Sequence, residues 1–268
     1  MKKIAIYGKG GIGKSTTTAN VSAAMSEMGL KLCQIGCDPK NDSTRLLLGH
    51  ICKQTVLDTV RDKEDVLAED IVHTGYNGIK CVEAGGPEPG VGCAGRGIIV
   101  ALEKLNSLHV LDDEDVILYD VLGDVVCGGF AVPIREGYAQ DIYIVSSGEL
   151  MSLYAANNIA KGVRRFAQRG QVRLGGIIGN GRNTPNEQQL LLEFAKRLGT
   201  QLVAFIPRDV IVNKAENNRQ TVLQYAPESK QADIYRNLAE SMLHNCNMSI
   251  PTPMTFEELE ELVAEYGN

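Results

Sequence analysis

Short runs of apolar residues recur along the chain and alternate with stretches of helical periodicity. Most runs are uninterrupted rather than alternating with polar residues, which is typical of strands that are covered on both faces. Such runs occupy residues 4–7, 32–36, 78–83, 116–119, 142–145, 174–178 and 202–206. Strands that alternate with helices predict an α/β fold with a doubly wound, mostly parallel sheet flanked by helices. Ligands of such sheets bind at the carboxyl ends of the strands.

Helical patterns lie between these runs. They are clearest at 15–28, 153–166 and 186–198, and in the last two the apolar residues share one helical face. Gly29 and Gly199 follow two of these segments and predict where the helices end.

The chain shows no internal repeat and no low-complexity linker, so residues 1–268 are expected to form one domain. Its last segment, 255–266, predicts a short acidic helix that is capped by Thr255. We expect this helix to pack against the domain or against a partner.

Composition narrows the class of protein. The chain has 268 residues, a net charge of −6, 28 glycines and seven cysteines. The negative charge argues against nucleic-acid binding, which usually requires a basic surface. The sequence has no recognisable signal peptide and no apolar run of membrane-spanning length, so we expect a cytoplasmic protein without a membrane partner. An odd number of cysteines in a reducing compartment indicates free thiols or metal ligands.

A phosphate-binding loop of the P-loop NTPase type occupies residues 8–15, between the first strand and the first helix. The pattern G-x-x-x-x-G-K-[ST] is met by Gly8, Gly13, Lys14 and Ser15. Backbone N–H groups of such a loop surround phosphate oxygens, while the lysine contacts the terminal phosphates and the serine holds Mg²⁺. The nucleotide-binding residues expected here are Gly8, Lys9, Gly10, Gly11, Ile12, Gly13, Lys14, Ser15 and Thr16.

Lys9 is not required by the general pattern, which makes the loop a deviant Walker A motif. It falls on the outer turn of the loop, where a side chain tends to point away from its own nucleotide. We therefore expect Lys9 to reach a nucleotide held by a neighbouring subunit. The alternative is a flexible glycine turn with solvated lysines.

Carboxylates follow two of the predicted strands. Asp120 ends the strand at 116–119, and Asp124 follows four residues later, as expected for groups that act near Mg²⁺. Asp38 and Asp42 follow the strand at 32–36, and Pro39 disfavours a helical conformation at Asp38. Either of these carboxylates would orient the attacking water or contact the metal. A solvated turn that caps the next helix is the alternative.

Cys93 and Cys127 are embedded in glycines, within 90–97 and 125–129. Glycines let the backbone approach a bulky ligand and direct N–H groups at its sulfurs. Two cysteines are half of the four thiolates that a [4Fe–4S] cluster requires, and a twofold dimer would supply the other half. Inert, glycine-flanked cysteines are the alternative interpretation.

The remaining cysteines lack this setting. Cys33, Cys37 and Cys81 lie in or beside apolar runs and are expected to be ordinary buried thiols, and no role is expected for Cys52 and Cys246. No C-x-x-C pair is present, which argues against a zinc knuckle or a thioredoxin-type centre.

The proximity of Cys127 to Asp124 links the two kinds of site. Cys127 is three positions past Asp124 and seven past Asp120, on one continuous segment. If Asp120 and Asp124 respond to the terminal phosphate, the same segment would move a cluster ligand. This spacing favours electron transfer that is gated by ATP.

The chain resembles the nitrogenase iron protein (dinitrogenase reductase) family over essentially its whole length. The resemblance is carried by IYGKGGIGKSTTT at 6–18, GCDPKNDSTR at 36–45, CVEAGGPEPGVGCAGRG at 81–97 and YDVLGDVVCGGF at 119–130. It implies an ATP-hydrolysing oxidoreductase that donates one electron at a time to a larger metalloprotein, the nitrogenase catalytic component, after receiving it from ferredoxin or flavodoxin. It further implies a homodimer with one MgATP per subunit and one [4Fe–4S] cluster held by Cys93 and Cys127 of both subunits.

The resemblance also implies roles for other residues. Lys9 would contact the neighbour's phosphates. Arg96 matches an arginine that some members carry ADP-ribosylated, and Arg135 falls where the family docks on its partner. Near the adenine the resemblance places Asn180, Pro207, Arg208 and Asp209.

Several positions depart from the pattern of nitrogenase itself. Asn41 replaces a usual alanine, Tyr138 stands where a lysine of the docking face is common, and Gly179 and Gly181 replace frequent cysteine and serine. The change at Tyr138 leaves related reductases as alternatives, namely those of tetrapyrrole (chlorophyll) biosynthesis, of coenzyme F430 assembly and of other nitrogenase-like systems. A partitioning or positioning ATPase without a cluster is a more distant alternative. The acidic C-terminal segment does not suit the anionic membrane that such an ATPase would bind.

Overall fold

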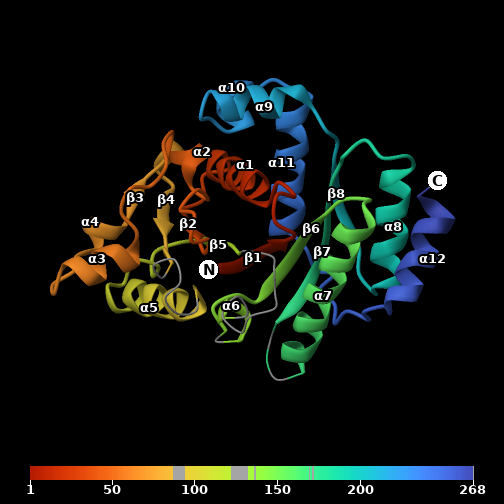
Figure 1. Cartoon of the computed structure of the whole chain (residues 1–268). Coiled ribbons are helices and arrows are strands. Elements are labelled where there is room, and N and C mark those ends of the chain that lie inside the picture. Colours follow the sequence, from red (N-terminus) through yellow and green to blue (C-terminus); the bar gives the residue numbers. More distant parts are fainter. Residues whose placement is uncertain (87–93, 122–131, 136, 169, 171, 268) are drawn as a thin grey trace.

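An eight-stranded sheet forms the centre of the structure (Figure 1), with the strand order β3-β4-β2-β5-β1-β6-β7-β8. This computed structural model describes residues 1–86, 94–121, 132–135, 137–168, 170 and 172–267, without the side chains of 94–96 and 135. Every neighbouring pair is parallel except β3 and β4. The predicted doubly wound α/β sheet is therefore confirmed. The strands are β1 (Lys2–Gly8), β2 (Leu32–Gly36), β3 (His73–Thr74), β4 (Lys80–Glu83), β5 (Val116–Asp120), β6 (Asp141–Ser146), β7 (Arg173–Asn180) and β8 (Leu202–Ile206).

The structure differs from the sequence prediction at one edge of the sheet. The strand expected from residue 78 begins only at Lys80, because Asn77 and Gly78 have φ angles of 50° and 81°. Such left-handed conformations do not fit a strand, and the residues form a short 3₁₀ turn instead. The antiparallel strand β3 was not predicted, since two residues are too few to show a periodic pattern.

Helices cover both faces of the sheet. Successive side chains of β1 point to opposite faces of the sheet. Ile4 and Ile6 join one apolar core with α1 and α11, whereas Ala5 and Tyr7 join a second core with α5 and α7. Figure 1 shows these helices on opposite sides of the strands. The helices are α1 (Lys14–Glu27), α2 (Arg45–Leu48), α3 (Val56–Asp62), α4 (Ala68–Ile71), α5 (Ala94–Ser107), α6 (Val132–Arg135), α7 (Leu150–Ala167), α8 (Glu187–Arg197), α9 (Val210–Asn217), α10 (Val222–Tyr225), α11 (Lys230–Leu243) and α12 (Phe256–Tyr266).

The C-terminal helix α12 begins as its sequence predicts. The Thr255 hydroxyl accepts a hydrogen bond from the Glu258 N–H at 3.2 Å, and the Glu258 carboxylate accepts one from the Thr255 N–H at 2.6 Å. Leu259 and Leu262 are buried, and α12 packs against α7 and α8. The tail therefore packs against its own domain.

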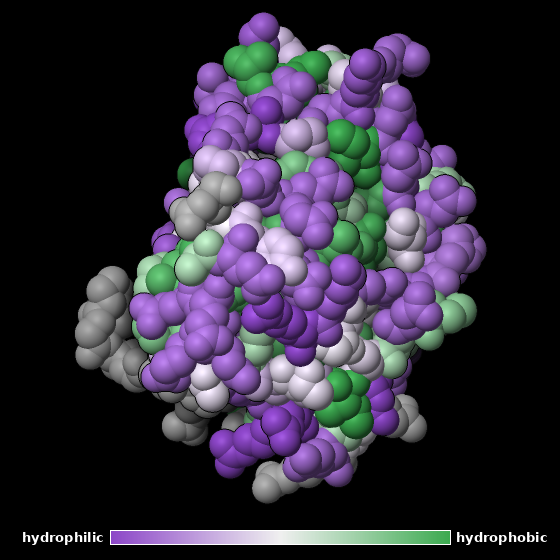
Figure 2. Space-filling model, turned by 90° about the vertical axis from the view of Figure 1, so that its right-hand side faces the viewer, coloured by the Kyte–Doolittle hydropathy of each residue, from purple (hydrophilic) through white to green (hydrophobic). Residues whose placement is uncertain are grey.

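The face that carries α8 and α12 is predominantly hydrophilic, with apolar side chains only in small separate groups (Figure 2). Within the part of the chain that the structure describes, none of the helices has the length and apolar composition needed to cross a bilayer.

Candidate nucleotide-binding site

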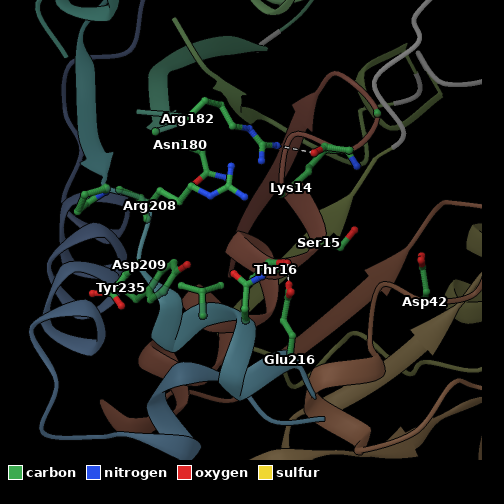
Figure 3. Close-up of a pocket in the computed structure, with 18 of the residues that line it drawn as sticks. Lys14, Ser15, Thr16, Asp42, Asn180, Arg182, Arg208, Asp209, Glu216 and Tyr235 are labelled. Atoms are coloured by element: carbon green, nitrogen blue, oxygen red, sulfur yellow. Dashed lines mark hydrogen bonds between the residues drawn. The ribbon is translucent and has the colours of Figure 1, made fainter. Parts of the chain in front are cut away.

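A pocket of about 400 Å³ lies at the carboxyl edge of the sheet, beside the loop that joins β1 to α1. This is the edge at which parallel α/β sheets bind ligands. Figure 3 places Asn180, Arg182 and Arg208 on one side of the pocket and Asp42 on the opposite side, with the start of α1 between them. The predicted residues that line the pocket are Gly10, Gly11, Gly13, Lys14, Ser15, Thr16, Asp38, Asp42, Asn180, Pro207, Arg208 and Asp209.

The remaining predicted residues of the loop, Gly8, Lys9 and Ile12, do not line the pocket. Lys9 is half-buried on the outer turn. Its expected contact with a neighbouring subunit stays a prediction.

The end of β7 holds the phosphate-binding loop in place. The Asn180 amide donates a hydrogen bond to the Ile12 carbonyl at 2.6 Å, and the Arg182 guanidinium donates one to the Gly11 carbonyl, also at 2.6 Å. Because a trans peptide directs its C=O and N–H in opposite directions, the Gly13 N–H points away from Asn180. Gly13 itself has a φ of 94°, and a Cβ at this position would collide with the Asn180 amide nitrogen.

Lys14 and Asp120 form a buried ion pair beside the loop. The Lys14 Nζ lies 3.5 Å from the Asp120 Oδ1, and both side chains are less than a tenth exposed. The pair is too long for a good hydrogen bond, and both carboxylate oxygens of Asp120 are buried without a hydrogen-bond donor. Buried acceptors of this kind suit a cation or its bound water, so the residues present fit Mg²⁺ with a nucleotide phosphate.

The segment that follows β2 brings two further carboxylates to the pocket. The Asp38 carboxylate accepts a hydrogen bond from the Lys40 N–H at 3.0 Å, which fixes the turn around Pro39. Asp38 is buried, whereas Asp42 is exposed. Both residues line the pocket.

Several residues in and around the pocket were not predicted from the sequence. The Thr16 hydroxyl donates to the Glu216 carboxylate at 2.5 Å, and the Glu216 carbonyl accepts from the Arg45 guanidinium at 3.2 Å. Arg182 and Tyr235 also line the pocket. Arg182 follows Asn180 by two residues at the end of a predicted strand, and this position is the only feature of the sequence that points to a place in the pocket for any of these residues.

Glu83 lies at the end of β4, near the carboxylates of the site. It is 1 % exposed. Burial, together with the negative charges of Asp120 and Asp42, raises the pKa of Glu83 to about 8, although hydrogen bonds from Thr44 oppose the change. The raised pKa favours the protonated form of this side chain.

The predicted cluster ligands Cys93 and Cys127 and the carboxylate of Asp124 lie outside the described residues, as do the side chains of Arg96 and Arg135. Cys33, Cys37 and Cys81 are buried, as expected, and burial raises the pKa of each thiol, which keeps it protonated. Cys52 is also buried, and Cys246 is exposed. Among the described residues, no group of three or more His, Cys, Asp or Glu side chains could hold a metal ion.

One family model matches residues 2–268, nearly the whole chain. Its description is 4Fe-4S iron sulfur cluster binding proteins, NifH/frxC family. This match agrees with the resemblance that the motifs of the sequence carry.

Solved structures with the same fold are more distant in sequence. The septum site-determining protein MinD of Pyrococcus horikoshii OT3, complexed with Mg-ADP, is 22% identical with a TM-score of 0.69, covering 90% of this chain and 95% of that one. A ParA family ATPase of Chlorobium tepidum TLS is 19% identical with a TM-score of 0.68, covering 91% and 100%. Cobyrinic acid a,c-diamide synthase of Mycobacterium smegmatis, with a bound ATP analog and magnesium, is 20% identical with a TM-score of 0.66, covering 95% and 100%. At these identities the similarity shows the fold alone.

Gly13→Ala is expected to weaken ATP binding more than tenfold in a nucleotide titration. The added Cβ would collide with the Asn180 amide, and a left-handed backbone costs a residue other than glycine roughly 1–3 kcal/mol. Gly29→Ala, outside the pocket, is the control for backbone strain, because Gly29 also has a left-handed φ of 84° and a Cβ there meets no atom within 4 Å. Equal losses in the two variants would contradict this account of the loop.

The contribution of Glu83 to the free energy of unfolding should fall as the pH rises from about 5 to 8, by at most about 1.4 kcal/mol per pH unit. Between the ordinary pKa of 4.5 and the raised value of about 8, the folded chain keeps a proton on Glu83 that the unfolded chain has lost. Glu83→Gln should flatten this part of the profile in denaturant titrations. A variant with the same slope as the wild-type chain would show that Glu83 is ionised when folded.

Proposed function

The chain belongs to the NifH/frxC family of 4Fe-4S iron–sulfur cluster binding proteins, and from this premise we propose that it is an ATP-dependent one-electron donor. The match over residues 2–268 is the observation that carries the proposal. The electron would pass from a [4Fe–4S] cluster to a nitrogenase catalytic component, coupled to MgATP hydrolysis.

The nucleotide half of this function is supported by the pocket. Lys14 would stabilise phosphate charge, with Lys9 of the neighbouring subunit, and Ser15 would hold Mg²⁺. Asp120 and Asp124 would sense the terminal phosphate, while Asp38 or Asp42 positions the water. The ion pair of Lys14 with Asp120 supports the sensing role of Asp120. A phosphate that attracts Lys14 would weaken this ion pair and so act directly on Asp120. Asn180 and the 207–209 segment would border the adenine.

The redox half rests on Cys93 and Cys127. The cluster, held by these two cysteines of both subunits, would supply one-electron chemistry. Because one subunit provides only half of the ligands, a homodimer is required. The same dimer would place Lys9 near the partner's nucleotide.

The choice of redox partner rests on the family match and on the docking residues. We propose the nitrogenase catalytic component as acceptor, ferredoxin or flavodoxin as donor, Arg135 as a docking residue and Arg96 as the site of ADP-ribosylation. Tyr138 is half-buried against the core beside α6. Because a lysine of the docking face is common at this position, a nitrogenase-like reductase with another electron acceptor stays an alternative.

A second candidate is a partitioning or positioning ATPase. MinD and a ParA family ATPase share the fold of this chain, and at their sequence identities the likeness extends to the fold alone. That function would give no role to Cys93 or Cys127. Iron content distinguishes the two candidates directly.

Anaerobically purified protein should be a coloured dimer with about four iron atoms. Cys93→Ala and Cys127→Ala should each abolish the iron and its visible absorbance, since a cluster loses two of its four ligands in a dimer of either variant. Cys246→Ala, at an exposed cysteine, is the matched control and should keep the iron. A colourless wild-type dimer would overturn the electron-donor proposal.

Lys9→Ala should bind nucleotide with nearly the wild-type affinity and yet lose ATP-coupled electron transfer. The reason is that Lys9 does not line the pocket of its own subunit. Nucleotide titration and transfer to a purified nitrogenase catalytic component are the two measurements. Full transfer by this variant would contradict the assignment of Lys9 to the interface.

A further inference from the structure

The segment that carries Asp38 and Asp42 is anchored at its base by buried side chains of two strands. Gln34 of β2 donates hydrogen bonds to the Ser43 carbonyl at 2.9 Å and to the Ser43 hydroxyl at 3.2 Å. Glu83 of β4 holds the next residue, Thr44. Its Oε1 accepts one hydrogen bond from the Thr44 N–H and one from the Thr44 hydroxyl, each 2.7 Å long.

The contact between Glu83 and Thr44 replaces an ordinary helix cap. Thr44 precedes the first residue of α2, where a threonine hydroxyl usually accepts a hydrogen bond from the helix backbone. Here the hydroxyl makes no such bond and is donated to Glu83 instead. The start of α2, and the loop before it, therefore depends on a side chain from another strand.

The backbone beside Glu83 is adapted to this carboxyl group. Gly36 is the partner of Glu83 in the register of β2 and β4. A Cβ at Gly36 would collide with the Glu83 Oε2 and the Ser43 Cβ. Oε2 has no hydrogen-bond partner among the described residues although it is buried. A buried polar group with one unsatisfied atom destabilises the fold, and such exceptions are expected mainly at functional sites.

We propose that Glu83 is a positioning residue that holds the 38–44 segment against the terminal-phosphate side of the nucleotide site, so that the chain distinguishes ATP from ADP. The proposal rests on the nucleotide half of the proposed function. Asp38 and Asp42 both line the pocket, and Figure 3 shows Asp42 across the pocket from Asn180 and Arg208. A looser segment would thus affect contacts to the terminal phosphate and its Mg²⁺, and would leave the adenine side intact.

Two pairs of variants test this in the full-length protein. Glu83→Ala removes the acceptor, whereas Glu83→Gln keeps a carbonyl oxygen in its place. Thr44→Val removes the hydroxyl donor at nearly constant volume, whereas Thr44→Ser keeps it. The affinities for MgADP and for a non-hydrolysable MgATP analogue are measured for each variant by titration.

Glu83→Ala and Thr44→Val should weaken binding of the ATP analogue about tenfold and of MgADP by less than about threefold. Glu83→Gln and Thr44→Ser should stay within about threefold of the wild type for both nucleotides. Such a split cannot come from a general loosening of the fold, which would weaken both nucleotides together. Should Glu83→Ala fail to fold, the Thr44 pair carries the test alone.

Equal losses for the two nucleotides would overturn the inference, as would wild-type discrimination in Thr44→Val. A loss in the conservative variants as large as in Glu83→Ala would also overturn it, because packing rather than hydrogen bonding would then matter. Iron content separates this inference from the redox proposal. A chain without iron that still shows the expected split would sink the electron-donor function and support the role of Glu83.

Discussion

The buried ion pair between Lys14 and Asp120 joins the phosphate-binding loop to the neighbouring strand, and the site depends on it. Two charges removed from water are stable only when their geometry is held firmly. The pairing of β1 with β5 supplies one support, since Ile6 lies opposite Asp120 in the register. Asn180 supplies another through its hydrogen bond to the loop. The pair is nevertheless incomplete, because Asp120 keeps two unsatisfied oxygens.

The ion pair of Lys14 with Asp120 offers a route by which nucleotide binding could affect the cluster. A bound phosphate and Mg²⁺ would attract Lys14 and Asp120 separately, and so alter the end of β5. The chain continues from that end towards Asp124 and Cys127. Beside this strand, the Glu83–Thr44 hydrogen bonds hold the segment that carries Asp38 and Asp42. The nucleotide would thus be contacted by two segments that follow adjacent strands, β2 and β5.

Much of the fold could be predicted from sequence, because apolar runs and helix caps are local patterns. Thr255 and Glu258 are three residues apart, so their capping box is visible in the sequence. The loop at 8–15 was likewise recognisable from spacing alone. Arg182, Glu216 and Glu83 were not, since each acts through a contact with a residue between 39 and 200 positions away. Such contacts exist only after the sheet has formed.

Nucleotide binding and the cluster are expected to be coupled, and the reduction potential of the cluster tests this coupling most directly. Spectroelectrochemical titration of the anaerobic dimer would compare the nucleotide-free, MgADP and MgATP states. We expect MgATP to shift the midpoint by tens of millivolts, where about 59 mV corresponds to a tenfold change in a one-electron equilibrium. An iron-loaded dimer that binds MgATP and yet has the same potential in all three states would contradict the account.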